Sequence, residues 1–132
     1  MKAFCTYCSK SKSHESGEIP AIRRYRSSRI KKVHEAALAV NLPFYVLSGR
    51  YGLVVPQRNI PDYDHLLREE EVSDLAQLVA KQISECQIDG FVFFIEPVAN
   101  DPNVQRYLDA MKEACSKPWL HLCPLCVVAL KE

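Results

Sequence analysis

Residues 44–64, FYVLSGRYGLVVPQRNIPDYD, decide how the chain is expected to fold. They open with four apolar residues, Phe44 to Leu47, between a proline and a hydroxyl-glycine pair, which is typical of a short strand buried on both faces. Ser48 to Gly52 then place a hydroxyl, a guanidinium, a phenol and two glycines just past the end of that strand. Ligands of open parallel sheets bind at this position, because backbone N–H groups and loop side chains converge there.

The turn after this strand is therefore the first candidate site. Glycines permit tight turns and close approach of the backbone, and Arg50 offers a forked donor for a carboxylate or a phosphate. A polar turn with a surface arginine is the structural alternative. The ligand contacts predicted for this turn are Ser48, Gly49, Arg50, Tyr51 and Gly52.

The segment that follows is expected to return to the same region. Pro56 and Pro61 stiffen its path, because proline fixes the backbone angle φ. Asp62, Tyr63 and Asp64 then bring two carboxylates and a phenol toward the turn. These three residues join the candidate site.

Length and composition predict a single domain, 1–132, with a core of its own. The formal net charge of +1 gives no global field that would attract nucleic acid or a membrane. The chain has no apolar run of about 18 residues and no basic-then-apolar leader, so we expect a cytoplasmic protein. Six cysteines in such a protein indicate thiols, metal ligands or redox groups rather than a disulfide framework.

Strands and helices are expected to alternate along the chain. Strands are predicted over residues 2–7, 44–47, 91–95 and 119–122, and 13–24 is predicted to be a polar loop. A helix capped by Ser27 or Ser28 is expected to bury Ile30, Val33, Ala37 and Leu38. Further helices are predicted from Val72 to about Gln87 and after Asp101-Pro102.

This alternation predicts an α/β fold, a three-layer sandwich of about four mostly parallel strands with helices on both faces. In that fold the carboxyl ends of parallel strands lie on one edge of the sheet. Residues Cys8–Lys10, Ser48–Arg50, Glu96-Pro97 and Cys123-Pro124 would then meet there.

Basic residues are concentrated near the first helix. Eight of them fall between residues 10 and 32: Lys10, Lys12, Arg23, Arg24, Arg26, Arg29, Lys31 and Lys32. Cations at a helix N-terminus oppose its dipole, and a bound anion such as a phosphate would compensate. A solvated helix start is the structural alternative. The pattern favours an anionic ligand without separating a nucleotide from nucleic acid.

Two cysteine pairs have the spacing of metal ligands. Cys5 and Cys8 form one Cys-x-x-Cys pair, and Cys123 and Cys126 form the other. If both pairs reached the same sheet edge, four thiolates could hold zinc or, as a second choice, an iron–sulfur cluster. Buried cysteines that only pack in the core are the alternative.

Four motifs carry a resemblance to known proteins: Cys8-Ser9-x-x-Lys12, Tyr25-x-x-Ser28, Ser48-Gly49-Arg50-Tyr51-Gly52-Leu53 and Ile60-Pro61-x-Tyr63-Asp64. Together they resemble a group of small uncharacterised bacterial and phage domains and, more distantly, the core domain of archaeosine synthase, which modifies a 7-deazaguanine base in transfer RNA. The similarity covers about the first half of the chain. It implies a nucleotide or modified-base ligand, with Cys8, Lys12, Tyr25, Ser28, Ser48, Arg50 and Tyr51 at the site.

The sequence thus predicts a domain that binds a phosphorylated nucleoside or a related base at the carboxyl edge of the sheet. If it is an enzyme, Cys8 is the nucleophile, because Lys10 or Lys12 would stabilise its thiolate. Asp62 or Asp64 would then act as acid or base, or accept hydrogen bonds from sugar hydroxyls. The alternative is a non-catalytic module that is held together by a metal and binds nucleic acid or protein.

Overall fold

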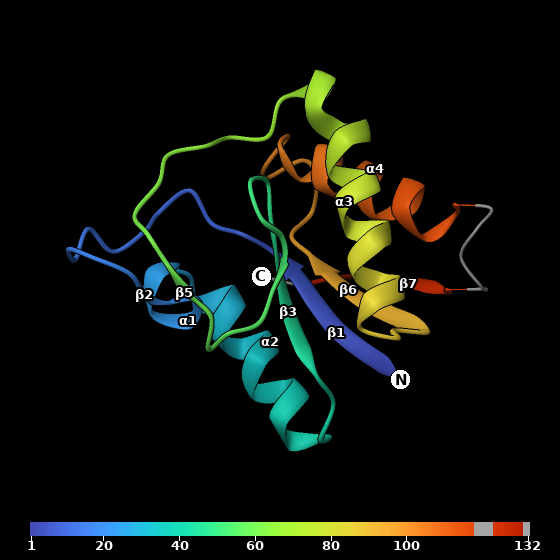
Figure 1. Ribbon diagram of the computed structural model, residues 1–132, viewed down its shortest axis with the longest axis horizontal. Coiled ribbons are helices and arrows are strands. Elements are labelled where there is room, and N and C mark those ends of the chain that lie inside the picture. The colour runs from blue at the N-terminus through green and yellow to red at the C-terminus, as the bar shows by residue number, and fades with distance from the viewer. Residues whose placement is uncertain (118–122, 131–132) are drawn as a thin grey trace.

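The structure is a computed structural model, and it describes residues 1–117 and 123–130. Its elements are, in chain order, β1 (Lys2–Tyr7), β2 (Ile19–Pro20), α1 (Ala21–Arg24), α2 (Ser28–Ala39), β3 (Phe44–Ser48), β4 (Gly52–Val54), β5 (Asn59–Ile60), the short 3-10 helix η1 (Glu69–Glu71), α3 (Val72–Glu85), β6 (Gly90–Ile95), α4 (Val104–Cys115) and β7 (Leu125–Ala129). Figure 1 shows their arrangement. None of the described helices is both long and apolar enough to cross a membrane.

A five-stranded sheet in the order β4-β3-β1-β6-β7 is the centre of the fold. β1 is parallel to both of its neighbours, β3 and β6, and β7 is parallel to β6. β4 alone is antiparallel, because it follows β3 through a tight turn. The α/β class is therefore confirmed, but four strands were too few.

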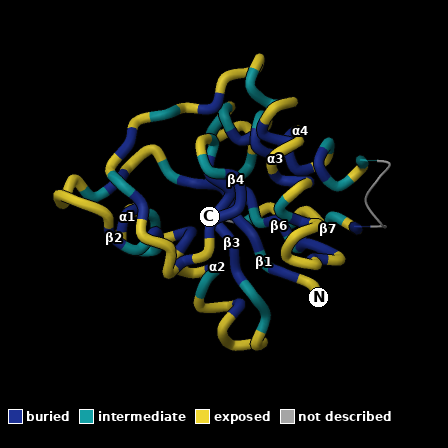
Figure 2. The backbone as a smooth tube through the Cα atoms, in the orientation of Figure 1, coloured by how far each residue is buried: buried dark blue, intermediate teal, exposed yellow. Residues whose placement is uncertain are grey.

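The helices lie on both sides of this sheet. α2 contacts β1 and β3 from one side, whereas α3 and α4 pack against one another on the other side (Figure 1). This follows from chain direction: the step from β1 to β3 runs one way along the sheet, the later steps to β6 and β7 run the other way, and right-handed crossovers place the two sets of helices on opposite faces. β1, β3 and β4 are buried along most of their length, whereas β7 at the far edge of the sheet is partly exposed (Figure 2).

The predicted helices form where their apolar residues repeat. Ser27 caps α2 by accepting a hydrogen bond from the N–H of Ile30, and Ile30, Val33 and Ala37 are buried. Leu38 was expected on the same face, but it is 64% exposed, because its position lies at the margin of the stripe that faces the sheet. α3, which forms where a helix from Val72 was predicted, buries Leu75, Ala76, Val79 and Ile83.

A small side unit occupies the stretch that was predicted to be a polar loop. β2 pairs with β5 in a two-stranded ribbon, and α1 follows directly after β2. Only a few residues form each element, so no periodic pattern announced them. The predicted strand over 119–122 lies entirely within residues 118–122, outside the described residues, and β7 supplies the fourth parallel strand.

Candidate functional site

The strand order identifies the place where a ligand is expected. From β1 the chain crosses to β3 on one side, while β6 lies on the other side, so the crevice between the carboxyl ends of β1 and β6 is a topological switch point. Cys8 follows β1 here, and Glu96 follows β6. Ser48, the last residue of β3, ends at the same edge, because β3 is parallel to β1.

A cavity opens at this switch point. We call it the inner pocket; its volume is about 150 Å³, and its lining includes Tyr7, Cys8, Lys12, Asp64, His65 and Tyr107. A wider hollow of about 480 Å³, the outer hollow, adjoins it and shares Lys10, Lys12 and Asp64 with it. Together they offer space in the range that small-molecule ligands occupy.

Cys8 lies at the base of the inner pocket. Only 7% of Cys8 is exposed, and its sulfur donates a hydrogen bond to the Tyr107 hydroxyl at 3.4 Å. Tyr107 in turn stacks on Tyr7, with 5.7 Å between ring centroids. The inner pocket is therefore lined by one thiol, Cys8, and two phenols, Tyr7 and Tyr107.

Lys12 is a buried cation between the inner pocket and the outer hollow. Only 8% of the residue is exposed, and its ammonium lies 4.6 Å from the ring centroid of Tyr63 and 5.9 Å from that of Tyr25. These cation–π contacts offset part of the cost of burial. No carboxylate or carbonyl among the described residues accepts a hydrogen bond from it. A ligand anion would supply the missing partner.

A chain of buried hydroxyls supports Lys12 from below. Tyr25 and Tyr63 are joined by a short hydrogen bond between their hydroxyls, and Tyr63 is 2.8 Å from the Ser48 hydroxyl. Ser48 also accepts hydrogen bonds from the N–H groups of Arg50 and Tyr51, both at 3.1 Å. Burial raises the pKa of Tyr63 to about 12 and raises the pKa of Tyr25 as well, so both phenols stay neutral.

The turn of the β3–β4 hairpin contains two glycines, and a side chain would be unfavourable at each for a different reason. At Gly49 an added Cβ would lie 3.3 Å from the Tyr107 hydroxyl, so a side chain would crowd the inner pocket. Gly52 has φ of +70° and faces the amide of Gln82 on α3. That amide accepts a hydrogen bond from the N–H of Leu53 at 2.7 Å and donates to the carbonyl of Tyr51 at 3.1 Å. α3 therefore fixes the hairpin.

The predicted ligand contacts separate into two groups. Lys10, Lys12, Tyr63 and Asp64 line the inner pocket or the outer hollow, whereas Ser48 and Tyr25 are buried beneath them and position them. Arg50 is exposed on the turn, and its guanidinium lies over the rings of Tyr51 and Tyr63 at 5.4 and 5.9 Å. It forms no ion pair with Asp62 or Asp64 in the part of the chain that the structure describes.

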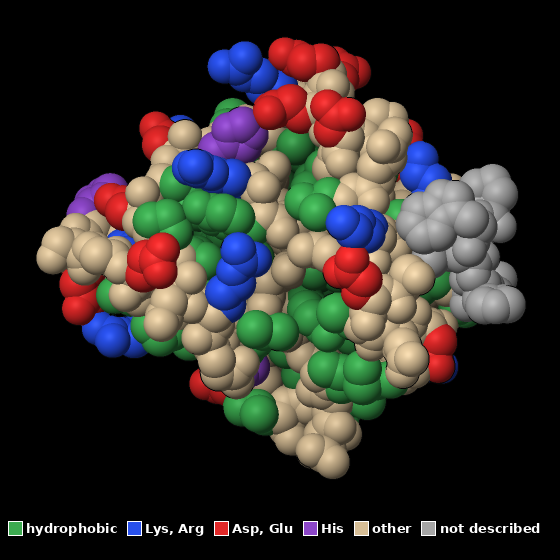
Figure 3. Space-filling view, viewed as in Figure 1, with side chains coloured by type: hydrophobic (Ala, Val, Ile, Leu, Met, Phe, Trp, Pro, Cys, Tyr) green, Lys and Arg blue, Asp and Glu red, His purple; other side chains and the backbone are tan. Residues whose placement is uncertain are grey.

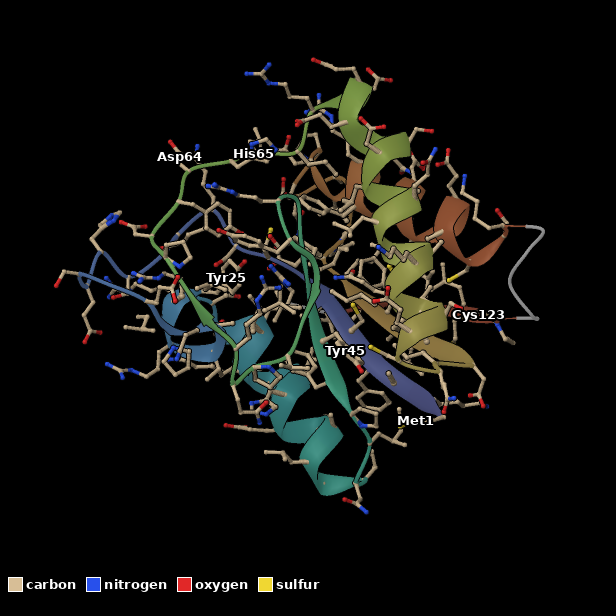
Figure 4. The ribbon with its side chains drawn as sticks, viewed as in Figure 1. Met1, Tyr25, Tyr45, Asp64, His65 and Cys123 are labelled. Atoms are coloured by element: carbon tan, nitrogen blue, oxygen red, sulfur yellow. The ribbon has the colours of Figure 1, made fainter. Side chains whose placement is uncertain are left out.

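Ser28, Asp62 and Asp64 lie at different distances from the inner pocket. Ser28 starts α2 and lines other hollows, away from the inner pocket. Asp62 pairs with His14 at 2.8 Å, and this hydrogen bond lowers the pKa of the Asp62 carboxyl. Asp64 lines the same pocket as Cys8 and is the better placed of the two aspartates to act on a ligand there. Figure 4 shows Asp64 and His65 together on the segment that passes over this edge.

The two cysteine pairs do not meet. Cys123 precedes β7, whose first residue pairs with Phe91 at the beginning of β6, so Cys123 lies at the opposite edge of the sheet from Cys8. Figure 4 shows Cys123 on the side away from Asp64 and Tyr25. Cys115 donates a hydrogen bond to Cys123, which lowers the pKa of Cys123. The expected convergence of Cys123 with Cys8 was wrong, because the last parallel strand begins after Cys123 rather than ending before it.

Metal-ligand groupings are also absent elsewhere in the described part of the chain: no three His, Cys, Asp or Glu side chains among residues 1–117 and 123–130 are arranged to hold an ion. Cys5 is fully buried in the core, and burial raises its thiol pKa. Cys126 is exposed on β7 opposite Val92. Cys5 and Cys123 are both buried.

Sequence reasoning missed two contributors to the site, Tyr107 and Tyr7. Tyr107 lies in the helix that was predicted after Asp101-Pro102, and Tyr7 ends the first predicted strand, but neither was singled out. Each is a phenol within an otherwise apolar row, and that polar atom was the available signal. Arg29 is also buried: its guanidinium donates to the Thr6 hydroxyl at 2.6 Å and to the Tyr7 carbonyl at 2.7 Å, which ties α2 to the end of β1.

The fold and the site together define an α/β protein with a small polar pocket at the switch point of its sheet. The chain belongs to a protein family of unknown function, DUF6884, whose model matches residues 6–99. No curated protein and no solved structure matches the chain. The matched range includes Cys8, Lys12, Ser48 and Tyr63, but it ends before α4 and Tyr107.

Proposed function

We propose that this protein binds a phosphorylated nucleoside or a related base at the switch point, with the ligand anion on Lys12. The observation that carries the proposal is the buried Lys12 ammonium, which faces two aromatic rings and has no acceptor among the described residues. Burying a charge without a partner is unfavourable, and a ligand phosphate would offset that cost.

The shape of the site supports the same ligand class. The inner pocket accommodates one small group, and the outer hollow accommodates the larger remainder of a ligand. Asp64, shared by both, is placed to accept hydrogen bonds from sugar hydroxyls. The similarity of the motifs to archaeosine synthase favours a base as part of that ligand.

Extended nucleic acid is a less suitable ligand for this protein than a mononucleotide or nucleoside. On the face shown in Figure 3, acidic and basic side chains are interspersed rather than gathered into a single basic surface. A nucleic-acid backbone is normally met by such a surface. The small pocket at the switch point therefore favours a mononucleotide or nucleoside.

Thermal unfolding with a panel of ligands tests the proposal. We expect at least one of the common nucleoside monophosphates to raise the melting temperature by several degrees at about 100 times its Kd. Lys12→Met should remove this shift, whereas Lys112→Met, an exposed lysine on α4, should retain it. If no nucleotide, nucleoside or inorganic phosphate shifts the wild type, or if Lys12→Met responds fully, the proposal is wrong.

Protection of Cys8 from alkylation tests whether the ligand binds in the inner pocket. A nucleotide in the inner pocket should slow alkylation of Cys8 by iodoacetamide, because the thiol lines that pocket. The exposed Cys86 and Cys126 should react at unchanged rates and serve as internal controls in the same sample. Peptide mass spectrometry reads all three, and equal rates at Cys8 with and without a stabilising nucleotide would place the ligand elsewhere.

A further inference from the structure

A second cavity lies between α2 and the carboxyl ends of β6 and β7. We call it the α2 cavity; its volume is about 320 Å³, and it shares no lining residue with the inner pocket. α2 covers β1 and β3 but leaves β6 and β7 less covered on its side of the sheet, so a groove remains between helix and strands. Its room is in the range of small-molecule sites.

Both walls of this cavity change from charged to apolar along the axis of α2. On α2 the lining passes from Ser28, Arg29 and Lys32 to Val33 and Ala36. On the opposite wall, Glu96 lies at the charged end and Phe94, two residues earlier on β6, lies toward the apolar end. This agreement follows from the fold, because a crossover helix runs antiparallel to the strands that it connects. One end of the cavity is therefore charged and the other is apolar.

The charged end has an excess of positive charge. Arg29 is 8% exposed, and its Nε has no hydrogen-bond partner in the described part of the chain; the carboxylate of Glu96 is 3.7 Å away. Lys32 pairs with no carboxylate among the described residues. The first turn of α2 contains no acidic residue, so the helix dipole adds to the same sign. Among the lining residues, one carboxylate, Glu96, thus faces two cations and a helix N-terminus, and the charge of Asp101 also acts on Arg29.

We infer that the α2 cavity binds a small amphipathic anion, a molecule with an apolar chain and a carboxylate at one end. Its carboxylate would lie at Lys32 and the first turn of α2, and its chain would lie between Ala36 and Phe94. From Ser28 to Ala36 the helix rises about 12 Å, which suits a chain of medium length. This site is independent of the proposed nucleotide site.

Titration with a series of carboxylates tests the inference, with octanoate, hexanoate and butanoate as the probes and octylamine as the charge control. Each buried methylene should strengthen binding by roughly threefold to fourfold. Octylamine should bind at least about tenfold more weakly than octanoate, because its ammonium meets cations. Calorimetry or NMR shifts of the Ala36 methyl group report the binding.

Variants on the exposed side of α2 test the apolar end and the charged end of the α2 cavity separately. Ala36→Phe fills the cavity and should abolish octanoate binding, whereas Ala39→Phe, on the same helix but outside the cavity, should not. Lys32→Met should weaken octanoate by about threefold to fivefold, with Lys31→Met unchanged. Glu96→Gln should strengthen it, because the competing carboxylate is gone.

The outcomes that overturn the inference are specific. They are no octanoate binding to the wild type, equal binding of octylamine and octanoate, or undiminished binding to an Ala36→Phe protein that melts as the wild type does. Ala36→Phe should also leave any nucleotide-induced thermal shift intact, so failure at one site is distinguishable from failure at the other. If Ala36→Phe does not fold, Lys32→Met and Glu96→Gln decide, and opposite signs are required of them.

Discussion

Arg24 and Lys12 are both buried cations, but they have opposite surroundings. The guanidinium of Arg24 is fully buried and donates to the carbonyl oxygens of Ser13, Glu15, Gly17 and Ile60. Lys12, on the neighbouring strand of backbone, has aromatic rings beside it and no acceptor among the described residues. Hydrogen-bond acceptors, and not burial, therefore distinguish a cation that stabilises the fold from one that is available to a ligand.

Arg24→Met is the change with the largest expected effect. It leaves buried carbonyl oxygens without a donor and should lower the free energy of unfolding by about 3 kcal/mol or more. Arg23→Met, at the next position, removes an exposed arginine paired with Glu15 and should cost under about 1 kcal/mol. Urea unfolding measures both, and equal losses in the two variants would contradict the structural role of Arg24.

Tyr63→Phe tests the hydroxyl chain beneath Lys12. Removing this hydroxyl leaves Ser48 and Tyr25 without their shared partner and should cost about 1–2 kcal/mol. Tyr51→Phe, which removes a phenol outside the chain, is the control.

The same variant should alter the pH dependence of stability. The pKa of Tyr63 is raised from 10.0 to about 12, so its contribution is complete below pH 10 and is lost as the pH rises toward 12. The wild type should therefore lose stability more steeply than Tyr63→Phe between pH 10 and 12, by up to about 1.4 kcal/mol per pH unit. Parallel slopes in the two proteins would show that Tyr63 does not carry this dependence.

Arg50→Ala should change the stability of the free protein by less than about 1 kcal/mol, because Arg50 is exposed and lacks an ion pair in the described chain. If Arg50 also binds the ligand anion, Arg50→Ala should weaken a stabilising nucleotide by about 1.5–3 kcal/mol and Arg50→Lys by less. Thermal unfolding with and without nucleotide separates the two effects. A drop of several degrees in the unliganded variant would assign Arg50 to the fold instead.

Lys12→Met should have the smallest effect on stability, within about 0.5 kcal/mol, since methionine keeps the contact with the aromatic rings and removes an uncompensated charge. Its effect should be far smaller than that of Arg24→Met. A loss above about 2 kcal/mol in urea unfolding would mean that Lys12, too, holds the fold.

The main elements were predictable because each has a repeating pattern. The apolar runs of β3 and β6 and the apolar stripes of α2 and α3 identified the strands and helices directly. β4, β2 and β5 were not predictable in this way, because strands of two or three residues show no periodicity and depend on their partners. The end of the chain was misassigned for a related reason: the apolar residues on both sides of Cys123 suit a strand equally well.

That the candidate site residues lie near one another was predictable from the sequence, but their detailed arrangement was not. The loops after β1 and β3 do meet at the carboxyl edge, because parallel strands bring them there. Sequence could not show that Ser48 and Tyr25 lie beneath the pocket while Lys12 borders it, since the alternation of strand faces ends at the loop. It also could not show that α4 contributes Tyr107, because that contact joins residues 99 positions apart.

The link between Gln82 and the hairpin has a consequence for how the molecule behaves in a crowded solution. The amide of Gln82 bonds both the N–H and, at 3.4 Å, the carbonyl of Leu53, so it occupies the backbone groups of the edge strand β4 in the way another strand would. An unpaired edge is a template for association between molecules. Gln82 thus occupies, at Leu53, the backbone groups to which a strand of another molecule would bind.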